Sequence, residues 1–389
     1  MWLLTPSHNR EAIEAGRSSQ VTFVYADVPG WPADSGAAAR IRRTHYNLWQ
    51  LRILATAKRM HRQLGFDVVH HLTYAQYWTG SWMGRLRIPF VWGPVGGGES
   101  APASVIEMLP PEGRRFERNR DLARWVGRRS PAVRSAARTA TLTLATTEES
   151  KRAVETLQRR DYTRRGVRKP GTTTSLASSV AVLSNCALPE SELDALAPST
   201  RSTAAFRVLC VGRLEHWKGF QFAIQAFASL LPEVPHAELH IVGTGPAESF
   251  LRDLVASLRL ERNVHFVGPL PRPEVLERLA ESHVLVHPSL HDSAGWATLE
   301  ASAVGLPVVC LDIGGPALQV TDETGIKVPV EQAHHIVPLM AKALTRLARD
   351  PQLASRLGAA GRRRVEANFT WNRIGDQLAT MVPYKLSAC

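Results

Sequence analysis

Two acids eight positions apart, Asp292 and Glu300, are the strongest candidates in the sequence for residues of a ligand-binding or catalytic site. Their segment, HDSAGWATLEASAVGLPVV (291–309), follows an apolar run that predicts a strand and opens an apolar run that predicts a helix. Asp292 could accept hydrogen bonds from sugar hydroxyls or stabilise a developing positive charge. Glu300 could accept hydroxyl hydrogen bonds from a ribose, because an unpaired carboxylate is costly within an apolar helix. Alternatively, Asp292 only caps the helix and Glu300 pairs with a surface arginine.

The turn between these acids suits a negatively charged ligand. Ser293 can cap the predicted helix, and Gly295 lets a ligand approach the backbone closely. We expect the first-turn amides of Gly295, Trp296 and Ala297 to point at an anionic group.

A pair of cations, Arg213 and Lys218, follows another predicted strand in VGRLEHWKGF (211–220), where Gly212 allows a sharp turn. A planar guanidinium and a compact ammonium together suit a diphosphate. The alternative, two surface cations at a helix start, is disfavoured by the helix dipole. Gly243, in HIVGTGPAE (240–248), marks a second strand–glycine–helix junction. We expect it only to line the cleft at the carboxyl ends of the predicted strands.

The first half of the chain offers further candidates at predicted strand ends. His70 and His71 end the run DVVHHL, where a histidine could face a ligand or simply be a satisfied polar neighbour. The run WGPVGGGES (92–100) would bring backbone amides, including that of Gly97, towards a ligand, or would form a plain flexible turn. Glu99 is a secondary candidate for contact with an acceptor.

Strands that alternate with helices must position these residues. The runs at 20–26, 67–72, 88–98, 141–146 and 180–185 predict one parallel sheet, and the runs at 207–212, 237–243, 263–268, 284–289 and 306–312 predict another. We therefore expect an α/β fold of two doubly wound domains, residues 1–190 and 203–370. The polar stretch 188–206 is predicted to be the linker. Ligands of such sheets bind at the carboxyl ends of the strands.

Composition narrows the function classes. The 389-residue chain carries a formal charge of +12, which favours anionic partners such as phosphates or acidic lipid surfaces, although a solvated basic face is the simpler interpretation. Nucleic acid ranks last because no nucleic-acid-binding motif accompanies the charge. Four cysteines without metal-type spacing predict a reducing cytoplasm. We expect no metal site, and a dinucleotide-dependent oxidoreductase is disfavoured because no G-x-G-x-x-G opens a helix with an acid downstream.

The cations, the Asp-x7-Glu spacing and the following GLPVVCLDIGG together resemble the nucleotide-sugar half of retaining glycosyltransferases of family GT4. The resemblance implies the two-domain GT-B fold, with Arg213 and Lys218 on the diphosphate and Glu300 on the ribose. Asp292 stands where the family usually has a glutamate beside the transferred sugar, while Gly314 and Gly315 would line the cleft. It also implies that the final helix (371–389), which contains Trp371, packs back on the first domain.

The first half resembles the family less. The family's His-x-His would need a histidine at Leu72, and the chain begins at what resembles a later strand, so we expect the first domain to be incomplete. The implied function is transfer of a sugar from a nucleoside-diphosphate sugar to a sugar, lipid-linked or small-molecule acceptor, in polysaccharide, glycolipid or glycosylated-metabolite synthesis. The alternative is a catalytically silent scaffold. The arginines of the first domain and its Trp78, Trp82 and Trp92 suggest peripheral contact with the inner face of an anionic membrane, unless these tryptophans are core.

Overall fold

Parallel sheets organise the computed structural model, which describes residues 1–389 except for 17–19, 31–38, 73–75, 165–178, 197–204 and 383–389. In its amino-terminal half, a four-stranded sheet has the order β3-β4-β5-β6, from Val69–His71, Phe90–Val95, Leu142–Ala145 and Ser179–Val182. A separate parallel pair joins β1 (Trp2–Thr5) to β2 (Thr22–Tyr25). Among the described residues, this pair is not hydrogen-bonded to the four-stranded sheet.

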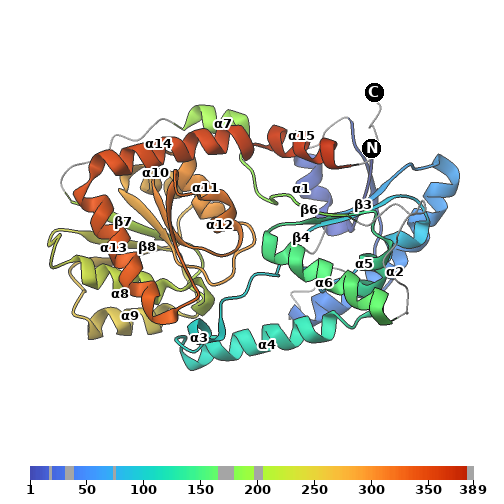
Figure 1. The fold of residues 1–389 in the computed structure, drawn as a ribbon. Helices are drawn as coiled ribbons and strands as arrows, with labels where there is room; N and C mark the ends of the chain where they lie inside the picture. The colour runs from blue at the N-terminus through green and yellow to red at the C-terminus, as the bar shows by residue number, and fades with distance from the viewer. Residues whose placement is uncertain (17–19, 31–38, 73–75, 165–178, 197–204, 383–389) are drawn as a thin grey trace.

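Helices flank this first sheet and extend towards the second domain. They are α1 (Arg10–Ala15), α2 (Ala39–Leu64), α3 (Ala103–Ile106), α4 (Pro111–Gly127), α5 (Pro131–Thr139) and α6 (Glu148–Arg164), with 3-10 turns η1 (Ser7–Asn9) and η2 (Met83–Leu86). Figure 1 shows α3 and the start of α4 reaching beneath the second domain. Val105 and Leu109, both fully buried, pack within the core of that second domain. The two domains therefore share part of one core.

The carboxy-terminal domain is a six-stranded parallel sheet in the order β12-β11-β10-β7-β8-β9. Its strands are β7 (Arg207–Val211), β8 (Glu238–Val242), β9 (Val264–Gly268), β10 (Val284–His287), β11 (Val308–Leu311) and β12 (Gly325–Val328). Its helices are η3 (His216–Lys218), α8 (Phe220–Leu230), α9 (Glu248–Ser257), α10 (Arg272–Glu281), α11 (Trp296–Ala303), α12 (Gly314–Gln319), η4 (Ala333–His335), α13 (Ile336–Arg349) and α14 (Pro351–Asn368). The predicted α/β fold of two doubly wound units is confirmed.

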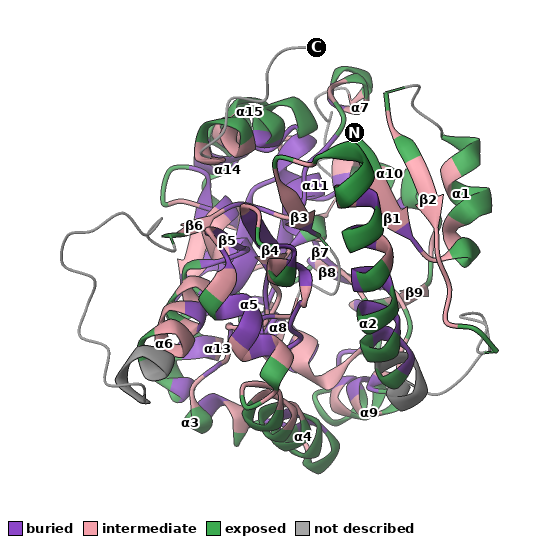
Figure 2. Ribbon diagram, turned by 90° about the vertical axis from the view of Figure 1, so that its right-hand side faces the viewer, coloured by how far each residue is buried: buried purple, intermediate pink, exposed green. Residues whose placement is uncertain are grey.

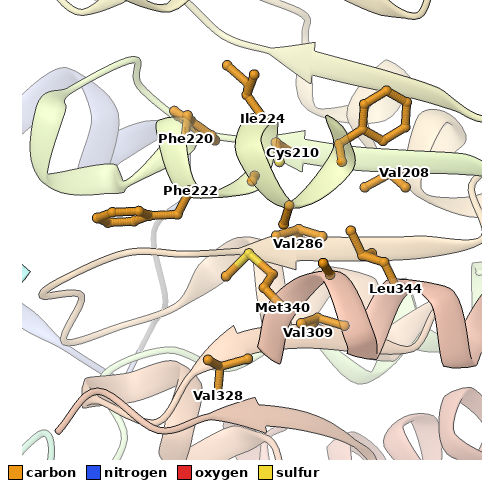
Figure 3. Packing of buried hydrophobic residues seen from close by; sticks show 14 of the residues in the cluster. Val208, Cys210, Phe220, Phe222, Ile224, Val286, Val309, Val328, Met340 and Leu344 are labelled. Carbon is orange, nitrogen blue, oxygen red and sulfur yellow. The ribbon is translucent and has the colours of Figure 1, made fainter. Parts of the chain in front are cut away.

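The core of this domain explains why its strands read as continuous apolar runs. Val208, Val286 and Val309, on three neighbouring strands, are fully buried and point at α8 and α13 (Figure 3). From those helices, Ile224 and Leu344 are fully buried against them. Each such side chain contributes roughly 1.5–3 kcal/mol when it leaves water, so the sheet is a rigid platform for the loops at its carboxyl edge.

The stretch 188–206, predicted to be a linker, is only partly irregular. Helix α7 (Glu190–Ala195) lies within it, begins after Pro189 and has two acids in its first turn, as suits a helix start. Leu193 is buried in a cluster with Leu299, on α11, and Val365, on α14. The prediction of a plain linker is therefore wrong for 190–195, because one leucine anchors the segment; residues 197–204 lie outside the described residues.

The last two helices connect the domains along one side of the molecule (Figure 1). α14 starts with a cap in which the Asp350 carboxylate accepts from the amide of Leu353 at 2.8 Å. α15 (Trp371–Met381) is capped by Thr370 and buries Ile374 against Val91 and Leu142 of the first sheet. Residues 383–389 of the expected final segment lie outside the described part. Within the described ranges, each helix is too short or too polar to cross a lipid bilayer.

Candidate functional site

The loops that follow β7 and β10 bring Lys218 and Asp292 together at the carboxyl edge of the six-stranded sheet. Lys218 Nζ lies 2.5 Å from Asp292 Oδ2, and both side chains are largely buried, with 13% and 16% exposed. The imidazole Nε2 of His287, at the end of β10, lies 3.3 Å from the same oxygen. The other oxygen, Oδ1, accepts from the amides of Ala294 and Gly295 at 3.3 and 3.1 Å.

These contacts keep Asp292 charged. Burial by itself would raise the pKa of its carboxyl, but the neighbouring imidazole of His287 and the charge of Lys218 outweigh it and hold that pKa well below its usual range. Burial and the charge of Lys218 lower the pKa of His287, although Asp292 opposes them, so we expect a neutral imidazole. The result is a cation and an anion held as a pair at the start of α11.

Further contacts join the same two loops to each other. The amide of Leu290 donates to the carbonyl of Trp217 at 2.9 Å. The Trp217 and His291 rings stack at 4.4 Å between centroids, with an angle of 15° between their planes. Lys218 Nζ also lies 4.7 Å from the centroid of the Trp217 ring. Because backbone, rings and the ion pair all connect them, the two loops form one unit.

Glu300, predicted on the basis of the resemblance to hold a ribose, pairs with an arginine in this structure. It is 8% exposed on α11, and its Oε1 accepts from Arg272 Nε at 2.9 Å; Arg272 also pairs with Glu192 at 2.6 Å. Burial raises the pKa of Glu300, although Arg272 opposes the shift. The alternative interpretation of the sequence, pairing with an arginine, describes this structure. A ribose would have to share Glu300 with Arg272.

The other donor-binding candidates differ in their accessibility. The side chain of Arg213 is 73% exposed, with Nη1 3.5 Å from Glu215 Oε1, so it does not join the Lys218–Asp292 pair. The amide of Gly295 was expected to face an anionic ligand, but it donates to Asp292 Oδ1 at 3.1 Å; Gly295 itself has a φ of 69°. Trp296 and Ala297 form the first turn of α11, and the Trp296 side chain is 42% exposed.

Several of the candidate glycines shape the site through backbone packing. A Cβ on Gly243 would lie 1.9 Å from the carbonyl oxygen of Gly212, so these two glycines allow the ends of β7 and β8 to converge. A Cβ on Gly314 would lie 2.4 Å from the carbonyl oxygen of Asp292. The amide of Gly315 donates to that oxygen at 2.7 Å. Gly314 and Gly315 therefore fix the backbone of Asp292.

The histidines of the first domain are engaged within that domain. His71 is 8% exposed, and its Nε2 lies 2.7 Å from the Tyr46 hydroxyl and 3.2 Å from Gln50 Nε2. His70 Nε2 lies 2.7 Å from the carbonyl oxygen of Gly93. Burial and His70 lower the pKa of His71 to about 4. In this structure the alternative of a satisfied polar neighbour describes both histidines.

Glu99 is buried where the two domains meet: a Cβ on Gly314 of the second domain would lie 3.2 Å from its Cγ. It is 1% exposed; Oε1 accepts from Thr147 and Ser150 at 2.6 and 2.8 Å, and Oε2 accepts from the amide of Gly97 at 2.8 Å. The amide of Gly98 donates to Ser150 Oγ at 2.9 Å. In this structure, the amides of Gly97 and Gly98 therefore donate to protein oxygens.

Sequence reasoning missed several residues that build the site. His287, Arg272 and Trp217 are neighbours of the two acids or of the lysine in space, and Glu149, from α6 of the first domain, accepts from the amide of Gly314 at 3.3 Å. Only His287, which ends the strand before Asp292, carried a sequence signal. The others come from distant segments.

Comparisons with known proteins match the second half of the chain to a family of enzymes. Residues 196–364 match the family described as "Glycosyl transferases group 1". A glycogen synthase from Mycobacterium tuberculosis is 34% identical over 178 residues, which cover 46% of this chain and 42% of that protein. A GDP-mannose-dependent monoacylated alpha-(1-6)-phosphatidylinositol monomannoside mannosyltransferase from Corynebacterium glutamicum is 32% identical over 182 residues, covering 45% and 46%. The alignments thus span less than half of these curated relatives.

The likeness of fold extends further than the likeness of sequence. The structure of Alr3699/HepE from Anabaena, solved in complex with UDP, superposes with a TM-score of 0.59 at 18% identity, over 97% of this chain and 90% of that one. Both domains and their relative arrangement therefore follow the GT-B fold. Over residues 196–364, less than half of its length, the chain is similar to the group 1 glycosyltransferases.

Proposed function

We propose that the chain is a glycosyltransferase that moves a sugar from a nucleoside-diphosphate sugar to an acceptor hydroxyl with retention of anomeric configuration. The observation that carries the proposal is the largely buried Lys218–Asp292 pair at the carboxyl edge of the family domain. A desolvated ammonium beside a helix start suits a diphosphate. Relatives named for glycogen synthesis and for GDP-mannose-dependent transfer support the reaction class.

The proposed reaction proceeds on one face of the sugar. The bond between the anomeric carbon and the diphosphate oxygen breaks, and the diphosphate leaves with the electron pair. The acceptor oxygen bonds to the same face of that carbon, and its proton passes to the departing diphosphate oxygen. Lys218 would stabilise the growing negative charge, with Arg213 turning in from its exposed position beside Glu215. Asp292 stays ionised and would stabilise positive charge on the sugar. No resident metal takes part in this scheme.

A binding experiment tests the donor assignment. Lys218→Ala and Arg213→Ala are titrated by calorimetry with UDP, GDP and ADP, and Lys342→Ala, an exposed lysine on α13, serves as control. Loss of a charge-assisted hydrogen bond costs about 2 kcal/mol, so affinity for the preferred nucleotide should fall roughly 30-fold for Lys218→Ala. Lys218→Arg should recover part of it, and chelation of divalent cations should leave the affinity of the unmodified chain unchanged. Equal affinity in Lys218→Ala and Lys342→Ala would refute the assignment.

A catalytically silent binding subunit is the second candidate, favoured by the protein partners that occupy both Asp292 and Glu300. Such a subunit would bind the nucleotide without consuming a donor. A screen of nucleotide sugars for stabilisation, followed by measurement of slow donor hydrolysis, separates the two functions. Release of nucleoside diphosphate by the purified chain, lost in Asp292→Asn, is the outcome expected of the enzyme.

We further propose that the protein works at the inner face of an anionic membrane, docked through α4. The tryptophans that suggested this contact are unsuitable, since Trp78 and Trp92 are buried in the core of the first domain and Trp82 packs at its margin under Arg85. Instead, the outward face of α4 exposes Leu122, Trp125 and Val126, each more than half exposed. Figure 2 shows that face open along the helix.

Cations surround these apolar side chains. Arg115 and Arg118 lie one to two turns before them on the same face, and Arg129 lies just beyond the end of the helix, its guanidinium carbon 3.7 Å from the centroid of the Trp125 ring. Apolar side chains framed by arginines fit an anionic lipid surface, where each cation contributes about 1 kcal/mol. A second copy of the same face would be repelled by its like charge.

Co-sedimentation with liposomes checks this docking. Binding should require an acidic lipid, weaken as salt is raised, and fall at least fivefold in Trp125→Ala, because both apolar burial and a cation–π partner are lost. Trp371→Ala, an equally exposed tryptophan on α15, is the matched control and should bind like the unmodified chain. Binding that is equal on neutral and acidic vesicles, or capture of acidic proteins but not vesicles, would exclude the membrane as the partner.

A further inference from the structure

The inward face of α4 contacts the same two loops that carry Lys218 and Asp292. Glu117 Oε1 lies 2.7 Å from His291 Nε2, and both side chains are nearly inaccessible, with 3% and 11% exposed. The ring of Phe116 is parallel to that of His291, with centroids 6.2 Å apart and 5° between the planes. His291 is thus in contact with Trp217 from its own domain and with two consecutive residues of α4.

These loop residues are the immediate neighbours of the donor-site pair. Trp217 precedes Lys218, and His291 precedes Asp292. Since the Trp217–His291 stack and the Lys218–Asp292 pair lie side by side on the same two loops, a shift of His291 moves Asp292 with it. The position of α4 is therefore coupled through one residue to the carboxylate of the site.

α4 is itself fixed on its inward face. Arg120 Nη2 donates to the carbonyl oxygen of Glu99 at 2.7 Å and to that of Gly97 at 3.3 Å, and Arg120 Nη1 lies 3.6 Å from Glu117 Oε2. A chain of contacts therefore runs from the glycine loop of the first domain, through Arg120 and Glu117, to His291. It joins the two domains by charged and polar groups.

Close packing restricts the position of α4 against the second domain. A Cβ on Gly113 would be 2.8 Å from the Cβ of His216, in η3, so no larger residue fits between α4 and that turn. Val105 and Leu109, just before α4, are anchored in the core of the second domain. With its start anchored and its approach limited by Gly113, α4 presents Glu117 to His291 in one register.

We propose that Glu117 and Phe116 are positioning residues for the donor site: through His291 and Trp217 they hold the loops that place Lys218 and Asp292. The assignment of a diphosphate to that pair rests on the proposed function, whereas the ordering of the loops by α4 does not. Neither residue touches the reacting atoms. Each acts through the loop that it contacts.

Two measurements on the full chain test this role. The first is amide hydrogen exchange of residues 213–219 and 288–295, which needs no ligand. The second is calorimetric titration with UDP and GDP. The variants are Glu117→Ala, Glu117→Gln and Phe116→Ala, with Glu112→Gln, an exposed acid in the first turn of α4, as control.

Glu117→Ala should speed exchange in both loops and weaken binding of the preferred diphosphate about tenfold, as expected for the loss of one buried hydrogen bond. Glu117→Gln should restore most of the affinity, since its amide oxygen can still accept from the imidazole. In a His291→Ala background, Glu117→Ala should cause little further loss, because both act through one contact. A merely structural role would lower the thermal midpoint without this rescue.

The outcomes separate the two proposals. If the unmodified chain binds none of UDP, GDP and ADP, the donor assignment to the Lys218–Asp292 pair fails, and loop exchange alone decides the positioning role. Faster exchange in Glu117→Ala than in Glu112→Gln then supports it. Equal exchange in these two variants overturns it, whether or not a nucleotide binds.

Discussion

At the scale of single residues, the carboxylate of Asp292 holds two parts of the site together. Its Oδ1 accepts from the amides of Ala294 and Gly295, in the loop just before α11, while its Oδ2 reaches Lys218. Asp292 therefore combines hydrogen bonds within its own loop with the ion pair to the neighbouring loop.

His71 provides a test at the same scale. Its pKa is lowered to about 4 from 6.5 in the folded chain, so the unfolded chain takes up the proton first as the pH falls. Stability from this group is complete above pH 6.5 and is lost between 6.5 and about 4, which amounts to about 2 kcal/mol at pH 5. In urea unfolding at about pH 7.5 and pH 5, His71→Gln should lose less stability between the two conditions than the unmodified chain.

His236→Gln, at an exposed position, controls for the general effect of removing an imidazole. Other buried histidines with lowered pKa values, His287 and His291, remain in both proteins and cancel in the comparison. If His71→Gln and His236→Gln show the same pH dependence, the buried, neutral state of His71 is wrong.

At the scale of elements, the turn into α8 depends on Gly219. Its φ is 69°, and a Cβ there would lie 2.1 Å from the carbonyl oxygen of Pro288 in the neighbouring loop. Gly219→Ala should therefore destabilise the fold by about 3 kcal/mol, through strain and a backbone clash. Gly375→Ala, within α15 where a Cβ meets nothing within 4 Å, should instead be neutral or stabilise by up to about 1 kcal/mol. Chemical denaturation of both variants checks the contrast, which similar losses in the two would refute.

The sequence patterns predicted the positions of strands more accurately than they predicted the contacts of side chains. The alternation of apolar runs located every strand from β2 to β11, because a buried parallel strand needs a continuous apolar run whatever its partners are. Helix α7 was missed because its short length and polar composition resemble a linker. Only burial of Leu193 between α11 and α14 makes it a helix in this setting.

At the scale of the whole molecule, α4 takes part in two proposals, the positioning of the donor-site loops and the docking on a membrane. Its inward face holds His291 and the glycine loop through Glu117 and Arg120, and its outward face exposes Leu122 and Trp125. A membrane bound at the outward face would lie one helix diameter from the loops of the donor site. Such a geometry suits an acceptor presented at a lipid surface.

By itself, the sequence determined the α/β class, the two tandem units and the resemblance of the second unit to group 1 glycosyltransferases, because apolar periodicity and the Arg213–Lys218 and Asp292–Glu300 spacings are local properties of the chain. Tertiary structure decided the partner of each side chain. It paired Glu300 with Arg272, turned the amide of Gly295 towards Asp292, and buried His71 and Glu99. Such partners come from segments far apart along the chain, so a local pattern does not reveal them. Because burial makes an unpaired charge costly, each buried charged group pairs with a protein group that the fold brings close to it.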